Sequence, residues 1–134
     1  INQMLKILLK KKIDIISTNR FIKKNSLDNW TWWRKILTKI RFLIIGKLLK
    51  INFDSSGAFR CYNTDKVKLK DLLSAKNNSY SFFWESTFLL NRRNYKIFEI
   101  PINLPARLAG SSKMEILDIF SALLYLLLFY LKKN

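Results

Sequence analysis

Segments with helical periodicity alternate along this chain with short runs of β-branched residues, and this alternation is the feature that most limits its possible folds. We predict helices over 1–12, 31–50, 64–73, 82–93 and 116–131, and strands over 13–16, 58–62 and 96–102. Residues 17–19 are expected to form a loop after the first strand. Helices that alternate with strands indicate an α/β architecture in which helices cover a sheet.

The final segment, 116–131, is almost wholly apolar and is interrupted only by Asp118. A helix needs about 20 apolar residues to span a bilayer, so the segment is borderline for a membrane span. A buried core helix, an interfacial helix and the first part of a transmembrane hairpin all remain open. The aromatic residues and terminal lysines of this segment favour a membrane boundary. We therefore expect residues 116–134 to be a membrane-associated helix, separate from residues 1–115.

The composition excludes several classes of chemistry. The chain has no His and a single Cys, Cys61. Ser–His catalysis, Cys–His catalysis, His-ligated metals and an internal disulfide are therefore impossible. Lys and Arg number 25 against nine Asp and Glu, and the formal net charge is +16. A nucleic acid, phospholipid head groups or a phosphorylated small molecule would suit this charge, and so would a solvated basic surface with no such partner.

Three groups of cationic and hydroxyl residues could bind an anion. Residues 17–20 end in Arg20 directly after a predicted strand, where α/β sheets bind ligands, although an arginine there is often solvated. Arg34, Thr38 and Arg41 share one face of the long helix, which could instead rest on lipid head groups or solvent. The loop 107–113 combines cations, hydroxyls and a glycine. Residues 54–60 add a carboxylate beside a glycine.

Six short motifs then resemble, in order, those of dolichyl-phosphate mannose synthases and related inverting family 2 glycosyltransferases. They are S-T-N-R-F at 17–21, W-x-x-x-R-K at 30–35, D-S-S-G-A-F-R at 54–60, Y-S-F-F-W-E at 80–85, I-F-E-I-P-I at 97–102 and R-L-A-G-S-S-K at 107–113. Ala58 departs from the family's pattern by an inserted or shifted small residue.

The resemblance implies a fold and an activity. Residues 1–115 would be the C-terminal portion of a GT-A-type, Rossmann-like nucleotide-sugar transferase domain. Such enzymes transfer a sugar, with inversion, from a nucleotide-sugar to dolichyl or polyprenyl phosphate at the cytoplasmic membrane face. Mannose from GDP-mannose is the leading case, and glucose from UDP-glucose is the alternative. Membrane lipids are a further implied partner.

The resemblance also assigns residues. It implies that Arg20, Arg34 and Thr38 bind the acceptor phosphate. Arg107 would bind the donor diphosphate together with Ser112 and Lys113. Arg107 and Asp54 are expected to be catalytic. Glu85 is a landmark of the motifs without a derived role: helix capping, pairing with an arginine and catalysis are equally open.

The resemblance places the nucleotide-binding strand and a metal-binding Asp-x-Asp motif upstream of the first helix. No Asp-x-Asp occurs in the 134 residues. We therefore expect the ligands of the implied Mg or Mn ion to lie outside this chain, which would be a fragment without transferase activity of its own.

Two functions of other classes remain as alternatives. One is a non-catalytic basic protein of the membrane surface, which would use the long helix and the apolar tail. The other is an RNA-binding module that stacks bases on aromatic side chains. Trp30, Trp32 and Trp33 have apolar neighbours at a helix start, where we expect core packing, so no nucleic-acid partner is expected.

Overall fold

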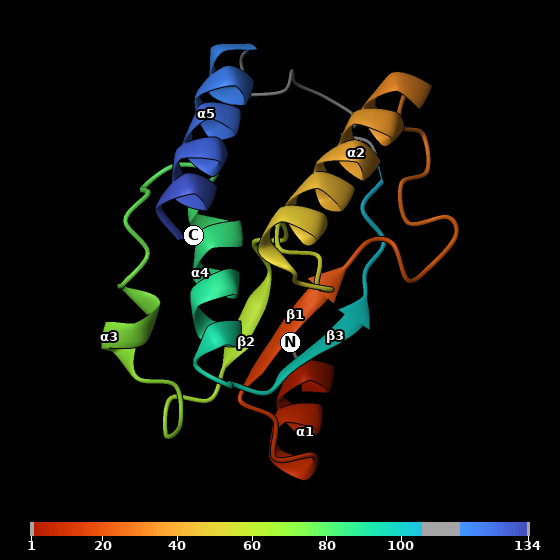
Figure 1. The fold of residues 1–134 in the computed structure, drawn as a ribbon. Coiled ribbons are helices and arrows are strands. Elements are labelled where there is room, and N and C mark those ends of the chain that lie inside the picture. Colours follow the sequence, from red (N-terminus) through yellow and green to blue (C-terminus); the bar gives the residue numbers. More distant parts are fainter. Residues whose placement is uncertain (1, 106–115, 134) are drawn as a thin grey trace.

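A three-stranded mixed sheet lies at the centre of the computed structural model, which describes residues 2–105 and 116–133 (Figure 1). Strand β1 (Ile15–Asn19) lies in the middle, antiparallel to β2 (Arg60–Tyr62) and parallel to β3 (Ile97–Pro101). The helices are α1 (Asn2–Lys10), α2 (Trp32–Leu49), α3 (Leu69–Leu72), α4 (Phe82–Arg92) and α5 (Ile116–Lys133). The predicted mixed α/β class is confirmed.

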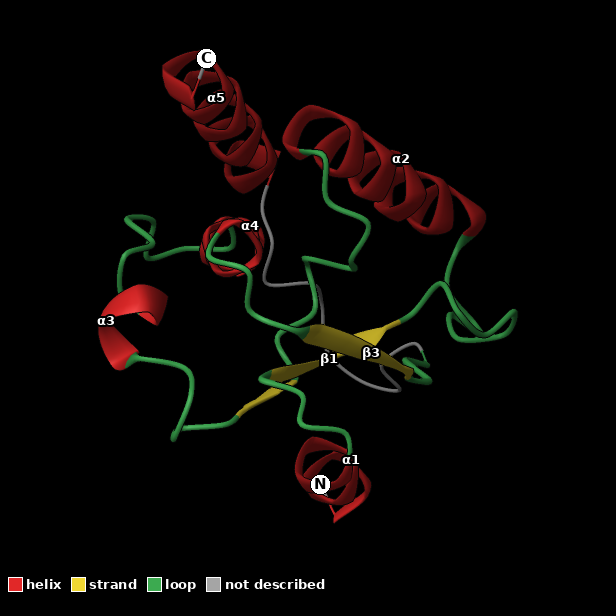
Figure 2. Cartoon of the chain, turned by 60° about the horizontal axis from the view of Figure 1, so that its bottom comes forward, coloured by secondary structure: helices red, strands yellow, loops and turns green. Residues whose placement is uncertain are grey.

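The two faces of the sheet are covered by different helices. Successive residues of a strand point to opposite faces, so Ile15 and Ile16 enter two separate cores. Ile16 packs with Met4 and Leu8 of α1, whereas Ile15 packs with Leu90 of α4. Figure 2 shows α1 on one side of the sheet and the helices α2, α4 and α5 on the other. The sheet is therefore the middle layer.

A third core joins the C-terminal ends of α2 and α5 to α4. It contains Ile45 and Leu49 of α2, Trp84 and Phe88 of α4, and Leu126 of α5. The ring of Phe129 meets those of Trp84 and Phe88 edge to face at centroid distances of 5.2 and 5.4 Å. This is the geometry that aromatic quadrupoles favour. Helix α5 is thereby fixed to α4 along one of its sides.

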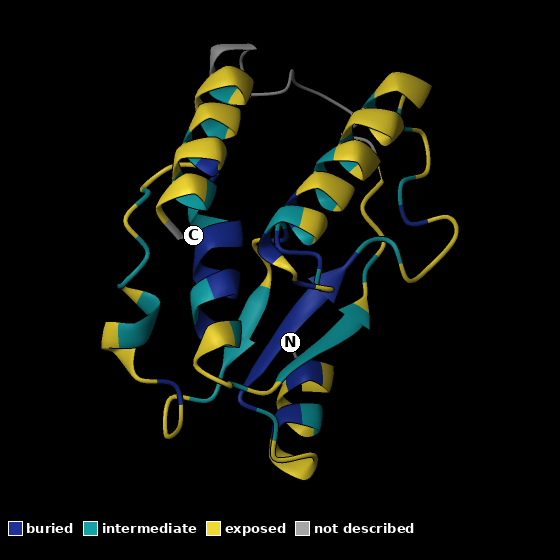
Figure 3. Ribbon diagram, viewed as in Figure 1, coloured by how far each residue is buried: buried dark blue, intermediate teal, exposed yellow. Residues whose placement is uncertain are grey.

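Helix α2 carries its apolar stripe on the outside. Trp32 and Trp33 are 74% and 51% exposed, and the apolar residues that follow at helical spacing are exposed as well (Figure 3). The core packing expected for these two tryptophans is therefore wrong. The buried and half-buried stripe consists instead of Arg34, Thr38, Arg41, Ile45 and Leu49. Ile45 and Leu49 at the end of this stripe pack into the core. The polar residues at its start therefore lie on the same side of α2, which faces the rest of the protein.

Two predicted elements differ from the observed ones. Strand β1 continues through Asn19 because Ser17, Thr18 and Asn19 lie buried opposite β3, so the loop expected at 17–19 is wrong. The helix expected over 64–73 is reduced to α3, because Asn63 accepts the N–H groups of Lys66 and Val67 through its backbone carbonyl and forms a turn.

Helix α5 has the predicted position, and most of its large apolar side chains outside the third core are exposed. None of the helices in the described part of the chain combines the length and the apolar character needed to cross a membrane. Association of α5 with a membrane surface remains a prediction.

Candidate functional site

The Arg20–Asp54 pair lies where β1 ends and forms the centre of the candidate site. The Asp54 carboxylate is 1% exposed and accepts the Arg20 Nε–H at 2.8 Å and the Arg20 backbone N–H at 3.2 Å. Ser56 Oγ donates to the other carboxylate oxygen at 2.8 Å and accepts from Arg20 Nη2 at 2.8 Å. Two residues predicted from separate motifs are thereby held in one rigid unit.

A second carboxylate fixes the turn that carries Asp54. Glu99 on β3 accepts the Asp54 backbone N–H at 2.6 Å and the Asn19 side-chain amide at 2.8 Å. Burial, opposed by these hydrogen bonds, raises the pKa of Glu99 above its usual value. Gly57 completes the turn, since a Cβ there would lie 3.0 Å from the carbonyl oxygen of Thr18. The ends of β1 and β3 therefore position the Asp54 turn.

Helix α2 brings two more arginines to this region. The rings of Phe21 and Phe42 stack with centroids 4.5 Å apart, which places the segment after β1 against the middle of α2. Arg41 lies next to Phe42 and interacts electrostatically with Arg20 and Asp54. Burial lowers the pKa of Arg41, and the charge of Arg20 lowers it further, while Asp54 raises it.

Arg34 lies two turns before Arg41 on α2, with its guanidinium 4.5 Å from the ring centroid of Trp30. The Trp30 indole N–H donates to the Leu104 carbonyl at 2.8 Å, and that contact fixes the ring on which Arg34 stacks. Thr38 lies between the two arginines on the half-buried stripe. The structure thus joins the first two predicted anion-binding groups into one region.

Arg60 has a different environment, although it comes from the same motif as Asp54. Its guanidinium donates to the carbonyl oxygens of Ser55, Gly57 and Phe83 at 2.7–2.9 Å and to Ser86 Oγ at 3.0 Å. These four bonds connect the Asp54 turn to α4. Arg60 therefore holds structure and has few donors left for a ligand.

Glu85 also holds structure. Its carboxylate is 2% exposed, accepts the backbone N–H groups of Lys76 and Asn77 at 3.0 Å each, and accepts the Tyr125 hydroxyl at 3.0 Å. Burial and the bond to Glu85 raise the pKa of Tyr125 to about 12. Glu85 thus fixes the loop before α4 and anchors α5, a role that was not among those left open, and within the described residues it forms no ion pair with an arginine.

The remaining predicted residues, Arg107, Ser112 and Lys113, lie outside the described residues. Their assignment to the donor diphosphate stays a prediction.

The residues present do not fit a metal site. In the ranges 2–105 and 116–133, no three His, Cys, Asp or Glu side chains come together as metal ligands would. The two carboxylates closest to the site are already engaged, Asp54 by Arg20 and Ser56, and Glu99 by Asn19 and the Asp54 N–H. We therefore derive no chemical step through a metal held by these residues.

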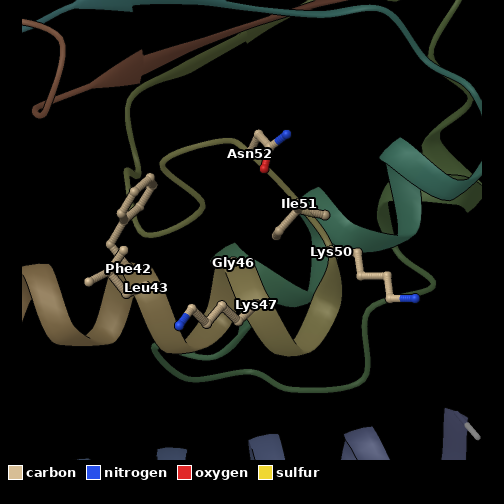
Figure 4. A pocket seen from close by; sticks show the side chains of 7 residues that line it. All are labelled: Phe42, Leu43, Gly46, Lys47, Lys50, Ile51 and Asn52. Atoms are coloured by element: carbon tan, nitrogen blue, oxygen red, sulfur yellow. The ribbon is translucent and has the colours of Figure 1, made fainter.

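A hollow of about 400 Å³ lies beside the C-terminal half of α2 (Figure 4). It is lined by Phe42, Leu43, Gly46 and Lys47 on the helix and by Lys50, Ile51 and Asn52 after it. None of the predicted site residues lines it. Its mainly apolar wall adjoins the site through Phe42.

Sequence reasoning missed the roles of Asn19 and Glu99, and it did not include Arg41 among the acceptor-binding residues. Glu99 lies within one of the six motifs, but its position opposite Ser17 of β1 depends on a strand register that the sequence alone does not report. Arg41 carried the better signal, since its spacing from Thr38 places it on the same helix face.

Among the known proteins that this chain resembles are two distant relatives whose names refer to mannosyl transfer or to polyprenol-linked mannose. The chain is 28% identical to the undecaprenyl-phosphate mannosyltransferase of Micrococcus luteus over 103 residues, which cover 76% of this chain and 42% of the relative. It is 25% identical to the polyprenol monophosphomannose synthase of Mycolicibacterium smegmatis over 103 residues, covering 76% of this chain and 39% of that protein.

The chain thus spans about two fifths of the length of the curated relatives it matches. No protein-family model matches it, and no solved structure does. The chain is a distant homologue of polyprenyl-phosphate mannosyltransferases and is related to glycosyltransferases. The recognition made from the motifs is confirmed at this level.

Proposed function

We propose that this chain provides the acceptor-binding portion of a GT-A-type glycosyltransferase that transfers mannose from GDP-mannose to a polyprenyl or dolichyl phosphate with inversion. The observation that carries the proposal is the region formed by Arg20, Arg34, Thr38 and Asp54. The motifs of Arg20 and Asp54 meet at the end of a central strand. Arg41 interacts with both of them and lies on the same stripe of α2 as Arg34 and Thr38, whose side chains can bind a phosphate. The names of the two distant relatives support the same class of acceptor.

The chemistry needs no histidine. A phosphomonoester has a second pKa of about 6, so its oxygen is already charged near pH 7 and needs positioning rather than deprotonation. A phosphate oxygen of the acceptor attacks the anomeric carbon, a C–O bond forms, and the bond to the nucleoside diphosphate breaks on the opposite face. Arg107, with Ser112 and Lys113, would stabilise the departing diphosphate. A divalent Mg or Mn ion, if used, would be held by other residues.

Asp54 contributes to this scheme through Arg20. Its carboxylate fixes the Arg20 side chain by Nε, Ser56 accepts from Nη2, and Nη1 has no hydrogen-bond partner within the described residues and could donate to an anion. We propose that Asp54 orients Arg20 and that Arg34 and Thr38 complete the acceptor phosphate site. Arg107 and Asp54 keep the roles that the motifs imply as predictions to be tested.

The proposal includes peripheral binding to the cytoplasmic membrane face. Helices α2 and α5 expose apolar side chains along most of their length, among them Trp32 at 74% and Phe120 at 66%. Aromatic and aliphatic side chains with nearby lysines are typical of helices that lie in a membrane interface. A lipid-linked acceptor would reach the arginines of α2 from that surface.

A chimera tests the activity. The chain replaces the matching region of the Micrococcus luteus relative, and transfer of labelled sugar to a polyprenyl phosphate is measured. GDP-mannose and UDP-glucose are compared as donors. We expect mannose transfer by the chimera and none by the 134-residue chain alone. Transfer by the isolated chain, or a folded chimera that binds both substrates without transfer, would contradict the proposal. A preference for UDP-glucose would support the alternative donor.

Flotation with liposomes tests the membrane surface. We expect the chain to float with vesicles, and Trp32→Ser and Phe120→Ser to reduce flotation while leaving the free energy of unfolding unchanged, because both side chains are exposed. Leu69→Ser on α3, also exposed, is the matched control. Equal flotation of all variants would argue against the proposed surface.

A further inference from the structure

Arg41 is a half-buried arginine that forms no ion pair with any of the described residues. Ion pairs among the described residues join Arg20 to Asp54, Lys66 to Asp14 and Arg93 to Asp71. Within those same parts of the chain no hydrogen bond reaches the Arg41 guanidinium. Taking an arginine partly out of water without an anionic partner is unfavourable, so its position calls for an explanation.

The nitrogens of Arg41 remain accessible to a ligand. No fully buried side-chain nitrogen or oxygen in the described residues lacks a hydrogen-bond partner. Since the guanidinium of Arg41 has no such partner, its nitrogens must retain contact with solvent. The Phe21–Phe42 ring pair fixes this part of α2 next to Arg20. The guanidinium therefore has free donors in a defined place.

The local charges favour a dianion. Asp54 forms its ion pair with Arg20, whereas the guanidinium of Arg34 stacks on Trp30. Arg41 feels the charge of Asp54 but forms no ion pair of its own within the described residues. Two arginines without an ion pair thus flank Thr38 on one stripe of α2, about 10 Å apart along the helix axis. The terminal phosphoryl group of a phosphomonoester carries a charge of about −1.5 to −2 near pH 7 and matches this pair.

We propose that Arg41 is a phosphate-binding residue that, with Arg20 and Arg34, selects the dianionic phosphoryl group of a phosphomonoester. Arg41 belongs to none of the motifs from which the acceptor site was assigned, and its role comes from its position alone. The inference rests on the proposed function only for the identity of the anion as the lipid acceptor. Phosphate binding by Arg41 itself does not depend on sugar transfer.

Calorimetric titration of the 134-residue chain tests the proposal with three probes: inorganic phosphate, a water-soluble short-chain prenyl monophosphate and a nucleotide-sugar, whose phosphates are both esterified and leave no terminal phosphoryl group. We expect Arg41→Gln to weaken binding of the first two about tenfold or more, since a charge-assisted contact is lost. Any binding of the nucleotide-sugar should change little. Lys39→Gln removes the same charge from an exposed position of α2 and is the matched control.

Equal weakening by Arg41→Gln and Lys39→Gln would overturn the proposal, because bulk charge would explain it. Unchanged phosphate binding by Arg41→Gln, or weakening confined to the nucleotide-sugar, would overturn it as well. If Arg41→Gln does not fold, Arg41→Lys replaces it: weaker phosphate binding supports the proposal and unchanged binding overturns it.

The outcome is separable from that of the proposed function. Phosphate binding that depends on Arg41, in a chimera without sugar transfer, would retain the site and refute the enzyme. Sugar transfer in which Arg41→Gln leaves the KM for the lipid phosphate unchanged would support the enzyme activity and refute the role of Arg41.

Discussion

The two sides of the turn that begins at Asp54 carry arginines in opposite situations. On one side, Arg60 donates four hydrogen bonds to the turn and to α4. On the other side, the guanidinium of Arg41 has no hydrogen bond within the described residues, and Arg34 rests on an aromatic ring. The same residue type therefore holds structure where its donors are used and remains available to a ligand where they are free.

This contrast teaches that a basic motif residue must be judged by its partners. Arg20 is intermediate between the two cases. Asp54 and Ser56 accept hydrogen bonds from two of its nitrogens, and Arg41 is close enough to interact with it electrostatically. Substitutions on the Arg60 side should lower stability. Substitutions on the Arg41 side should leave stability nearly unchanged and alter binding.

The largest effect is expected at Arg60. Arg60→Met should lower the free energy of unfolding by about 3 kcal/mol, because it removes several charge-assisted bonds and takes the arginine donor from the carbonyl oxygens of Ser55 and Gly57. The Phe83 carbonyl keeps the hydroxyl donors of Ser86 and Thr87. Urea unfolding measures the change. Arg92→Met, at an exposed position of α4, is the control and should be nearly neutral. A fully stable Arg60→Met would remove the distinction between the two sides.

Gly57→Ala should have the next largest effect. The new Cβ would meet the Thr18 carbonyl oxygen at 3.0 Å, and backbone cannot yield as a side chain can. We expect a loss of about 2 kcal/mol in urea unfolding. The shift of the turn should also weaken phosphate binding, since Asp54 and Ser56 orient Arg20. A stable variant with normal phosphate binding would show that the turn does not couple the two sides.

Tyr125→Phe should cost about 1 kcal/mol at pH 7, because Glu85 loses one of its three donors. In the parent chain the hydroxyl keeps its proton in the folded state up to about pH 12 but loses it near pH 10 when unfolded. Stability should therefore fall as the pH rises from 10 to 12. Unfolding at a series of pH values should show this fall in the parent and lose most of it in Tyr125→Phe.

The smallest effect on stability is expected at Arg41. Arg41→Met removes an unmatched charge beside Arg20 and should leave the free energy of unfolding unchanged or raise it by about 0.5 kcal/mol at low salt. Thermal and urea unfolding with and without added salt give the comparison. Destabilisation by more than about 1 kcal/mol would place Arg41 with Arg60 among the structural arginines.

The sequence was sufficient for the class of fold and for most helices, because periodicity reports them directly. The approach of Arg20 to the long helix was implied only by the family resemblance of the motifs. It was insufficient for the orientation of α2. A stripe of Trp33, Ile36, Leu37 and Ile40 is typical of a core-facing side, but periodicity shows only that one face is apolar and not what covers it. The extension of β1 through three polar residues was missed for a related reason, since their burial depends on long-range pairing with β3.

The central position of β1 also affects how rarely this part of the backbone opens to solvent. Its backbone pairs with β2 on one edge and β3 on the other, so we expect its amides to exchange with solvent only when the sheet itself opens. Arg20 follows this strand directly, whereas Arg34 and Arg41 belong to a helix whose outer face is exposed over most of its length. The Arg20 side of the proposed phosphate site would then persist for as long as the fold does, whereas the exposed first turns of α2, which carry Arg34, would open and close many times within that interval.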